Sequence, residues 1–443
     1  MKVLAFATQK LKLHSWVNPS SSVQAVNFWH LYWDIAWFGI AFGSTMSFLP
    51  VFATRLGATG WQVGLLNALP ALVSVLFTLY AGRWVEARPL KGVLKQTIIL
   101  QRLGFVLLIP LPCLLPASWQ ISMVLLLTLL MAIPGTALVI GFNAMLAATV
   151  PPEFRGRVVG GRNALLAGTI MLSFLLSGAI LDRLSFEWGY FVLFSLGALG
   201  AVMSAYHVIC IQVPEPPPEF EGRSLRDHAQ PARLVALTGT VPQRLTMGLR
   251  LLLNWRPSAN SLGRVSRGFW WAMFAFFLFH FAQLLPTPLY PLFWVREVQL
   301  TDGQIAWVNA LFFLTMLMAS PFLGALTKRW GNYHLIVWGA VLLALYPLLT
   351  AFSKDMTLLI VAATTGGAIW AILSGALYNR LLEIVPANDR PVYLAVYNLA
   401  LNIAMLSATM LGPLLVDVFG LRETLLVVTL LRMGSGLALA RWG

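Results

Sequence analysis

The sequence is poor in charged residues, and the few that it has are mostly basic. Only 10% of the 443 residues are charged, whereas 58% are hydrophobic and the mean hydropathy is +0.77. A soluble domain carries about 25% charged residues, so the composition excludes an ordinary soluble protein. The apolar residues fall in blocks near the ~20 residues that a helix needs to cross a bilayer. Short segments of alternating hydrophobicity, typical of a membrane barrel, are missing. The sequence therefore predicts an all-α membrane protein.

Several chemical signatures are missing as well. The two cysteines, Cys113 and Cys210, fall near opposite membrane faces in the predicted topology, so we expect no disulfide. No G-x-x-x-x-G-K-[ST] motif indicates an ATP-driven step. No H-E-x-x-H motif or Cys/His cluster indicates a metal site. We expect no cofactor, no metal and no enzymatic activity. The apolar run in the N-terminal MKVLAFATQK is too short for a signal peptide, and we interpret it as a cytoplasmic lead-in.

Twelve apolar stretches are long enough to be membrane spans. Spans 1 to 6 are predicted at 27–52, 61–83, 93–115, 120–148, 158–182 and 188–212, and spans 7 to 12 at 268–294, 303–326, 334–353, 356–384, 391–417 and 421–441. The predicted organisation is an N-terminal segment (1–26), a six-helix bundle (27–212), a linker (213–267) and a second six-helix bundle (268–443). The linker starts with PEPPPEFEGR, whose prolines exclude a helix there. Its later part, around Arg244 to Trp255, is mildly amphipathic and fits a helix on the membrane surface.

Lysine and arginine are distributed unevenly between the two sides of the predicted membrane. One side holds the N-terminus, the loops after even-numbered spans and the C-terminus, and it carries most of the basic residues, including eight arginines between Arg223 and Arg267. The other side holds only Arg55, Arg183, Arg296, Lys354 and Arg422. The positive-inside rule makes the first side cytoplasmic, with both termini inside a cell membrane. The formal charge of +14 then reflects the inner leaflet, and we expect no nucleic-acid partner.

The two halves of the chain repeat one another. In alignment, Phe28-Trp29 meets Phe269-Trp270, Pro50 meets Pro291, Gln62 meets Gln304, Asn163 meets Asn398 and Asp182 meets Asp417. Six spans repeated in the same orientation indicate two bundles related by an axis along the membrane normal. The solute cavity of such a protein lies between the bundles, and alternating access is a rocking of one bundle against the other.

Short charged turns follow corresponding spans of the two halves. The turn Gly82–Lys91 reads GRWVEARPLK, and a degenerate copy at Gly324–Tyr333 reads GALTKRWGNY. Pro151, Arg155 and Gly156 follow span 4, and Glu383-x-x-Pro386-x-x-x-Arg390 follows span 10. With six plus six spans, these motifs resemble the major facilitator superfamily, whose first turn runs roughly G-x-L-x-D-R-x-G-R-K. Trp84, Ala87, Pro89 and Leu90 depart from that pattern, and Lys328 replaces the acid in the second copy. The resemblance implies a secondary transporter for a small molecule.

These turns predict a gate on the cytoplasmic side. An acid there can pair with arginines at helix starts, where the helix dipole adds partial positive charge. The candidate pairs join Glu86 to Arg390, and Glu383 to Lys328, Arg329 or Arg390. The alternative is a set of solvated loop charges, each worth ~0–1 kcal/mol. The predicted gate residues are Gly82, Glu86, Arg88, Arg155, Gly324, Lys328, Arg329, Glu383 and Arg390.

Asp34 is an ionisable residue about 10 Å into span 1, one helical turn after His30. The two side chains share a helix face. Ionisable groups inside spans are costly and usually face a cavity or a partner. Two interpretations stay open: Asp34 is a proton-coupling acid tuned by His30, or the two residues form a structural hydrogen-bonded pair near the inner surface.

Other polar residues lie within the predicted spans. The resemblance puts spans 1, 4, 7 and 10 at the centre, which makes Asn143, His280, Gln283 and Asn379 candidates for lining a solute cavity. Arg102 in span 3 is expected to snorkel to the cytoplasmic surface. Arg432 in span 12 lies too deep for that, and the sequence offers it no evident partner. Pro286, Pro288 and Pro291 predict a kink in the outer half of span 7.

The combined sequence features favour a monomeric, proton-coupled secondary transporter of a small organic solute. Export of an amphipathic solute is our first hypothesis, and uptake of a sugar or metabolite is the alternative. The Gly-Pro signature of exporters in the superfamily is not clear here, because Ser177-Gly178 stands where it belongs in span 5. From a different class, the chain is interpretable as a transporter-like protein that serves as a membrane assembly factor or sensor. The expected partners are the solute, protons and the lipid bilayer.

Overall fold

The computed structural model describes residues 22–213, 267–385 and 390–443, and every regular element within them is a helix. The predicted N-terminal segment, up to residue 21, and the predicted linker helix lie outside the described residues. The first group of helices comprises α2 (Ser22–Ala41), the π-helical turn η2 (Phe42–Met46), α3 (Leu49–Arg55), α4 (Gly60–Glu86), α5 (Leu90–Leu108), α6 (Leu111–Leu114), α7 (Ala117–Thr149), α8 (Pro152–Leu181) and α9 (Phe186–Cys210).

The second group follows residue 266. It comprises α12 (Arg267–Leu284), α13 (Leu289–Leu292), the π-helical turn η4 (Phe293–Glu297), α14 (Asp302–Ala319), the short η5 (Ser320–Phe322), α15 (Leu323–Leu343), α16 (Leu345–Phe352), α17 (Met356–Ile384), α18 (Arg390–Phe419) and α19 (Leu421–Trp442). Spans 1 and 7 are each broken in their second half, because η2 interrupts span 1 and Pro286 to Pro288 separate α12 from α13. The kink predicted for span 7 is present.

Eleven stretches of the described chain are long and apolar enough to cross a membrane. Every predicted span lies on one of them, and spans 8 and 9 share the single stretch Asp302–Phe352. Gly331 breaks this stretch with φ 75° and ψ 158°, a backbone conformation that essentially only glycine adopts. The all-α membrane fold is therefore confirmed, with spans 8 and 9 separated by a one-residue break where we predicted a loop.

Matching capping boxes begin α4 and α14, which are the second spans of the two halves. Thr59 accepts a hydrogen bond from the backbone of Gln62, whose side chain accepts from the Thr59 N–H, and Thr301 and Gln304 make the same pair of bonds. Each box satisfies two backbone donors that a helix start leaves without partners. The repeated T-x-x-Q sequence thus builds the same local structure twice.

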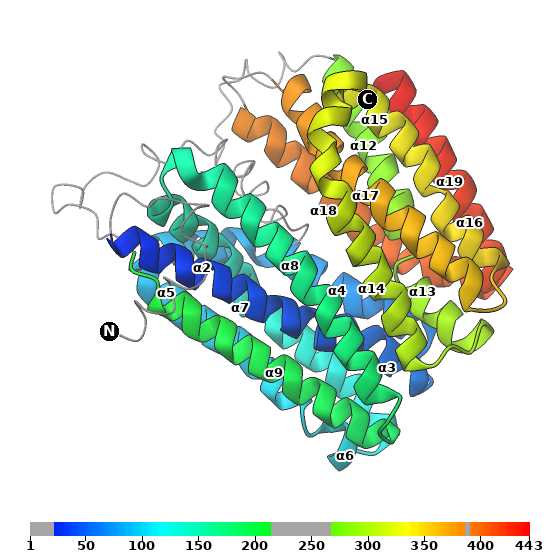
Figure 1. Ribbon diagram of the computed structural model, residues 1–443, viewed down its shortest axis with the longest axis horizontal. Helices are drawn as coiled ribbons and strands as arrows, with labels where there is room; N and C mark the ends of the chain where they lie inside the picture. The colour runs from blue at the N-terminus through cyan, green and yellow to red at the C-terminus, as the bar shows by residue number, and fades with distance from the viewer. Residues whose placement is uncertain (1–21, 214–266, 386–389) are drawn as a thin grey trace.

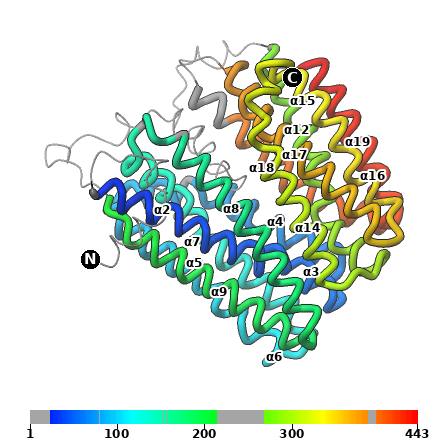
Figure 2. Tube along the Cα trace, in the orientation of Figure 1, coloured from blue at the N-terminus to red at the C-terminus, as the bar shows by residue number. Residues whose placement is uncertain are grey.

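Helix packing in the two groups follows the same pattern (Figure 2). The contacts of α2 with α8 and α9 recur as contacts of α12 with α18 and α19, and those of α7 with α4 and α5 recur as contacts of α17 with α14 and α15. Between the groups, α8 contacts α14 and α4 contacts α18, which are also equivalent pairs. The two groups converge near α3, α13 and α14, and they diverge toward the end where the C-terminus lies (Figure 1).

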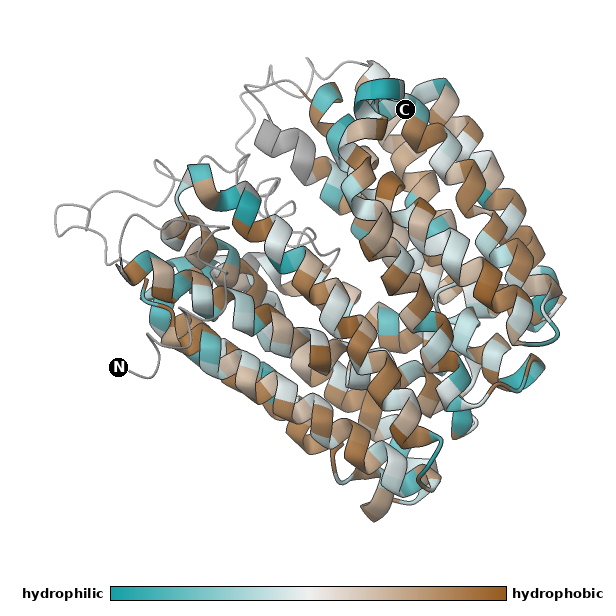
Figure 3. Cartoon of the chain, viewed as in Figure 1, coloured by the Kyte–Doolittle hydropathy of each residue, from teal (hydrophilic) through white to brown (hydrophobic). Residues whose placement is uncertain are grey.

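Hydrophobic residues cover the middle of the helices, and hydrophilic ones gather toward their ends (Figure 3). Large apolar side chains such as Leu100, Leu172 and Leu430 are exposed on the outside of the bundles. In a bilayer these side chains face lipid tails, while the helices satisfy their own backbone groups. The surface around the middle of the bundles is therefore apolar, as expected for a protein surrounded there by lipid.

Candidate functional site

Polar groups from the two groups of helices meet at the end where the helices converge. Arg55, the last residue of α3, forms an ion pair with Asp302, the first residue of α14, with Nη2 and Oδ1 2.9 Å apart. The Arg55 guanidinium also donates to the carbonyl of Leu300. Tyr190 of α9 donates its hydroxyl to the other carboxylate oxygen, Oδ2, of Asp302 at 2.9 Å. One carboxylate therefore joins spans 1, 6 and 8.

Two further contacts complete this arrangement. Asp182, at the end of α8, accepts a hydrogen bond from the backbone N–H of Gly303 at 3.0 Å. Arg296 of η4 donates to the carbonyl of Ala58. A side chain at position 303 would collide with the Asp182 carboxylate, so this close approach requires a glycine. We call Arg55, Asp182, Tyr190, Arg296, Asp302 and Gly303 the outer latch, after the side of the membrane on which the sequence analysis predicts this end to lie.

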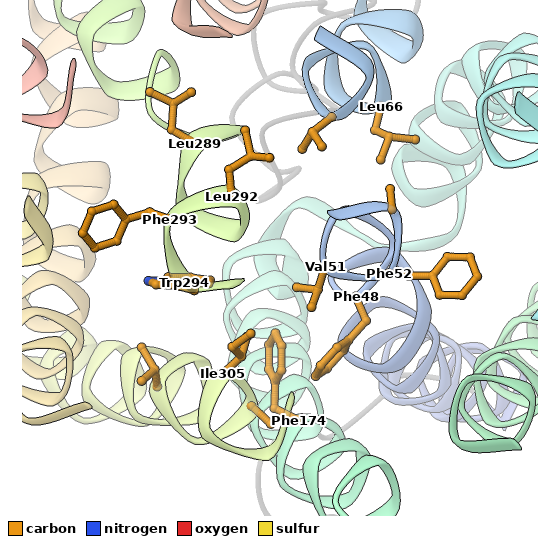
Figure 4. Close-up of a cluster of buried hydrophobic side chains, with 14 of the residues drawn as sticks. Phe48, Val51, Phe52, Leu66, Phe174, Leu289, Leu292, Phe293, Trp294 and Ile305 are labelled. Atoms are coloured by element: carbon orange, nitrogen blue, oxygen red, sulfur yellow. The ribbon is translucent and has the colours of Figure 1, made fainter. Parts of the chain in front are cut away.

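A cluster of apolar side chains lies beside the latch (Figure 4). Phe48, Val51 and Phe174 come from the first group of helices, and Leu292, Trp294 and Ile305 come from the second; all six are at most 5% exposed. The rings of Phe174 and Phe313 also stack across the two groups, with centroids 5.8 Å apart. Burying one such side chain is worth about 1.5–3 kcal/mol. We call these six residues the outer plug, and together with the latch they join the two groups of helices at this end.

The sequence analysis did not assign a role to the outer latch. Arg55 and Arg296 were noted only as two of the five basic residues on the predicted non-cytoplasmic side. Asp182 was noted only because this residue aligns with Asp417 in the repeat. The structure shows why Arg55 and Asp302 need partners, because both lie partly buried where the two groups of helices meet. Which partners they find depends on the packing of the halves.

At the other end, the first predicted gate turn differs from the expectation. Gly82 lies inside α4, which continues to Glu86, and the turn itself is formed by Ala87 to Pro89. Glu86 is exposed, and the side chain of Arg390 lies outside the described residues, so an ion pair between them stays a prediction. The guanidinium of Arg88 lies over the ring of Trp84 at 4.8 Å and donates to its carbonyl at 3.4 Å.

The second predicted gate turn also differs. Glu383 forms an ion pair with Arg380 at 3.1 Å and accepts a hydrogen bond from Asn332 at 2.6 Å. Lys328 and Arg329 are exposed, and among the described residues neither forms an ion pair with Glu383. Arg380, one helical turn away on the same helix, holds the Glu383 carboxylate instead. The third predicted partner, Arg390, has its side chain outside the described residues, so that pairing stays a prediction.

Asn379 and Gly324 lie near the same end of the second group. Asn379 donates to Asn332 at 3.4 Å near the end of α17, and its place in the lining of a central cavity stays a prediction. Gly324 is exposed inside α15, and a Cβ there would meet nothing within 4 Å, so this glycine serves no close helix approach.

Arg155 caps a helix in this structure. It follows α7, and its guanidinium donates to the carbonyls of Ala147 and Val150, both at 2.9 Å. These carbonyls belong to the last turn of α7, where a helix lacks its own donors. The motif from Pro151 to Gly156 therefore ties the end of span 4 to the start of span 5.

Asp34 forms a buried polar cluster with partners that the sequence analysis did not predict. The Asp34 carboxylate, in a residue that is 4% exposed, pairs with Arg162 of α8 at 3.1 Å and accepts from Ser204 of α9 at 2.7 Å. Arg162 also donates to the carbonyl of Leu31. Both carboxylate oxygens therefore have partners on other helices, and the bond from Arg162 is charge-assisted.

Arg102 corrects one expectation in this region. It is 7% exposed and does not snorkel to the surface; instead it donates to Ser204 at 3.2 Å, so it belongs to the Asp34 cluster. His30, predicted to tune Asp34, is hydrogen-bonded through Nδ1 to Nδ1 of His207 at 2.9 Å. The sequence thus indicated Asp34 correctly as a buried group but not its partners, which come from spans 5 and 6, while Arg102 of span 3 reaches the cluster through Ser204.

The remaining cavity candidates are buried polar groups in central spans. His280 Nε2 is 2.8 Å from the hydroxyl of Tyr397, and this bond joins spans 7 and 11. The side-chain oxygens of Asn143 and Gln283 are buried and have no hydrogen-bond partner in the described part of the chain. A buried polar atom without a partner costs about 1–3 kcal/mol. Both oxygens are therefore candidate acceptors for a solute or for water.

Comparisons with known proteins agree with this architecture. The family profile of the Major Facilitator Superfamily matches residues 35–292 and 272–442. A protein of Deinococcus radiodurans, provisionally named as a sugar efflux transporter, is 24% identical over 412 residues, which are 91% of this chain and 93% of the relative.

Solved transporters share the fold at low sequence identity. A nucleoside transporter has a TM-score of 0.67 at 12% identity over 94% of this chain and 99% of its own. A bacterial homologue of the iron transporter ferroportin, in an inward-facing state, has a TM-score of 0.67 at 13% identity over 95% and 98%. A bacterial homologue of the lysosomal transporter Spinster, inward-facing and unoccupied, has a TM-score of 0.65 at 13% identity over 96% and 98%. The profile match extends over nearly all of the described helices, and the chain is a member of the Major Facilitator Superfamily of membrane transporters.

Proposed function

We propose that this protein is a secondary transporter that works by alternating access and has the outer latch closed in the conformation described. The observation that carries the proposal is the outer latch, in which Asp302 joins spans 1, 6 and 8 while the helices diverge at the opposite end. If the positive-inside rule holds, that opposite end is cytoplasmic and both termini lie inside the cell. The conformation is then inward-facing.

We propose a small, uncharged organic solute, with export as the direction. The relative from Deinococcus radiodurans supports this class, because its name assigns it to sugar efflux. Hydrogen-bonding groups in central spans, among them Asn143 and Gln283, suit hydroxyl groups better than they suit an ion. Mono- and disaccharides and amphipathic glycosides are therefore the first solutes to test, and uptake of the same solutes is the alternative direction.

Proton coupling through Asp34 is part of the proposal. In the inward-facing conformation the Asp34 carboxylate accepts bonds from Arg162 and Ser204, so a proton that binds to it has to compete with these two donors. Protonation would remove the negative partner of Arg162 and leave its guanidinium unpaired inside the bundle. Because an unpaired buried charge is costly, the two protonation states favour different packings of spans 1 and 5.

The decisive experiment is transport in proteoliposomes with and without an imposed pH gradient. The wild-type chain should transport at least one of the mono- and disaccharides or glycosides faster when the pH gradient is imposed. Asp34→Asn should make the transport rate independent of the gradient. Asp355→Asn is the matched control, because Asp355 is an exposed helix cap that bonds only locally to Thr357. If no solute moves in either condition, the transporter proposal fails, and the assembly-factor or sensor hypothesis takes its place.

A further inference from the structure

Arg432 lies in the middle of α19, deep inside the second group of helices. It is 3% exposed, and no carboxylate among the described residues forms an ion pair with it. An isolated charge at this depth of a membrane protein is expensive unless polar groups surround it. The arginine therefore needs acceptors of another kind, and the structure supplies three backbone carbonyls.

The guanidinium divides its donors between two neighbouring helices. Nε donates to the carbonyl of Ala282 at 3.3 Å and Nη2 to that of Gln283 at 3.1 Å, both near the end of α12. Nη1 donates to the carbonyl of Leu343 at 3.0 Å, at the end of α15. The rigid fork of an arginine is suited to such a bridge, because its donors point in fixed and different directions.

Each of these three carbonyls lacks the backbone N–H donor, four residues later, that a continuous helix would supply. The carbonyl of Ala282 would accept from the residue at position 286 and that of Leu343 from the residue at position 347, but both are prolines without an N–H. The N–H of Thr287, which would serve Gln283, bonds instead to Leu284 at 3.1 Å. Arg432 thus replaces the donors that the breaks in spans 7 and 9 remove.

We propose that Arg432 is a positioning residue that clamps the break in span 7 and so holds the α13–η4 segment against the other half. This proposal rests on the proposed function, in which that segment closes the outer end. Arg432 Nη2 lies 3.5 Å from the hydroxyl of Tyr290, whose ring stacks on Trp294 of the outer plug at 5.8 Å. The same segment carries Arg296 of the outer latch.

The first half treats the equivalent place differently. The alignment that places Asp182 opposite Asp417 places Gly197 opposite Arg432. A Cβ at Gly197 would collide with Thr45 in η2, so α9 packs directly against the break in span 1. In the second half a side chain spans the corresponding gap. The break in span 7 is therefore held through one residue, which makes its position sensitive to a single substitution.

Labelling of a buried cysteine tests the clamp. In a chain with Cys113→Ser and Cys210→Ser, Leu292→Cys places a thiol in the outer plug, where Leu292 is 1% exposed. A membrane-impermeant maleimide then reacts in proportion to the open fraction. Arg432→Leu should speed labelling roughly tenfold or more, because it leaves three buried carbonyls without donors. Arg441→Leu, which removes an exposed charge from the same helix, should leave the rate unchanged.

A rescue experiment covers the case in which Arg432→Leu folds poorly. Pro286→Ala and Pro347→Ala return the two missing N–H donors, so the combined variant should regain most of the lost yield and melting temperature. Its labelling should stay fast, since no guanidinium then joins α19 to the α13–η4 segment. Unchanged labelling in Arg432→Leu, or no rescue by the alanines, overturns the clamp. If no sugar alters the labelling of the parent Leu292→Cys chain, in which Arg432 is intact, the result would instead count against the proposed function.

Discussion

Asp302 offers the sharpest test of the outer latch, because one carboxylate accepts from Arg55 on span 1 and from Tyr190 on span 6. Asp302→Asn keeps the shape and the helix start but removes the charge. A hydrogen bond to a charged group is worth about 1.5–3 kcal/mol, and Arg55 and Asp302 are only 26% and 12% exposed, so solvent screens the pair incompletely. The amide oxygen of asparagine remains as an acceptor, so we expect the closed state of the outer end to lose about 1.4 kcal/mol relative to the open state. That loss is roughly a tenfold change in the closed–open equilibrium constant.

The assay is the labelling of Leu292→Cys in the outer plug. If the latch holds the outer end closed, Asp302→Asn should raise the labelling rate roughly tenfold. Asp355→Asn serves as the control, because Asp355 caps α17 without reaching the other half. A double-mutant cycle with Arg55→Leu should show that the two effects are not additive, since both variants remove the same contact. Equal labelling rates in the Leu292→Cys chain with and without Asp302→Asn would refute the latch.

Four further substitutions test local features of the fold. Gly331→Ala should lower the free energy of unfolding by about 1–3 kcal/mol, because residues other than glycine rarely adopt its backbone conformation. Gly324→Ala should be neutral or stabilising, because a Cβ there is unobstructed within a helix. Thermal unfolding in detergent compares the two variants, and equal losses of stability would contradict the helix break assigned to Gly331. Thr301→Ala should cost about 1 kcal/mol in the same measurement, since it removes a capping bond. Gly197→Ala should lower the melting temperature through its collision with Thr45, and an unchanged value would mean that α9 can shift.

The fold was accessible from the sequence because its main determinant is local. A run of apolar residues must cross the bilayer as a helix, since lipid offers no partner for backbone groups. Length and composition alone therefore placed the spans, and the order of the repeat indicated which helices are equivalent. The exception is Gly331, where the second half uses one unusual backbone conformation in place of a loop.

The site was less accessible, because its residues are joined across long distances in the chain. Asp34 could be recognised as costly within a span, but Arg162 and Ser204 are its partners only through the packing of three helices. Glu383 could be recognised as a charged residue near a turn, but Arg380 on the same helix competes for it. Charge patterns therefore indicated which residues need partners without identifying those partners.

By itself, the sequence determined that the chain is a repeated helical membrane protein and which residues have to avoid lipid. Those properties follow from the free energy of transfer of each side chain and backbone group, which depends on composition along the chain. Only the tertiary structure decided that the halves meet through Arg55, Asp302 and Tyr190 at one end, and that Arg432 serves the carbonyls left open by Pro286 and Pro347. Hydrogen bonds and ion pairs form over a few ångströms, so residues far apart in sequence become partners only when the helices bring them together.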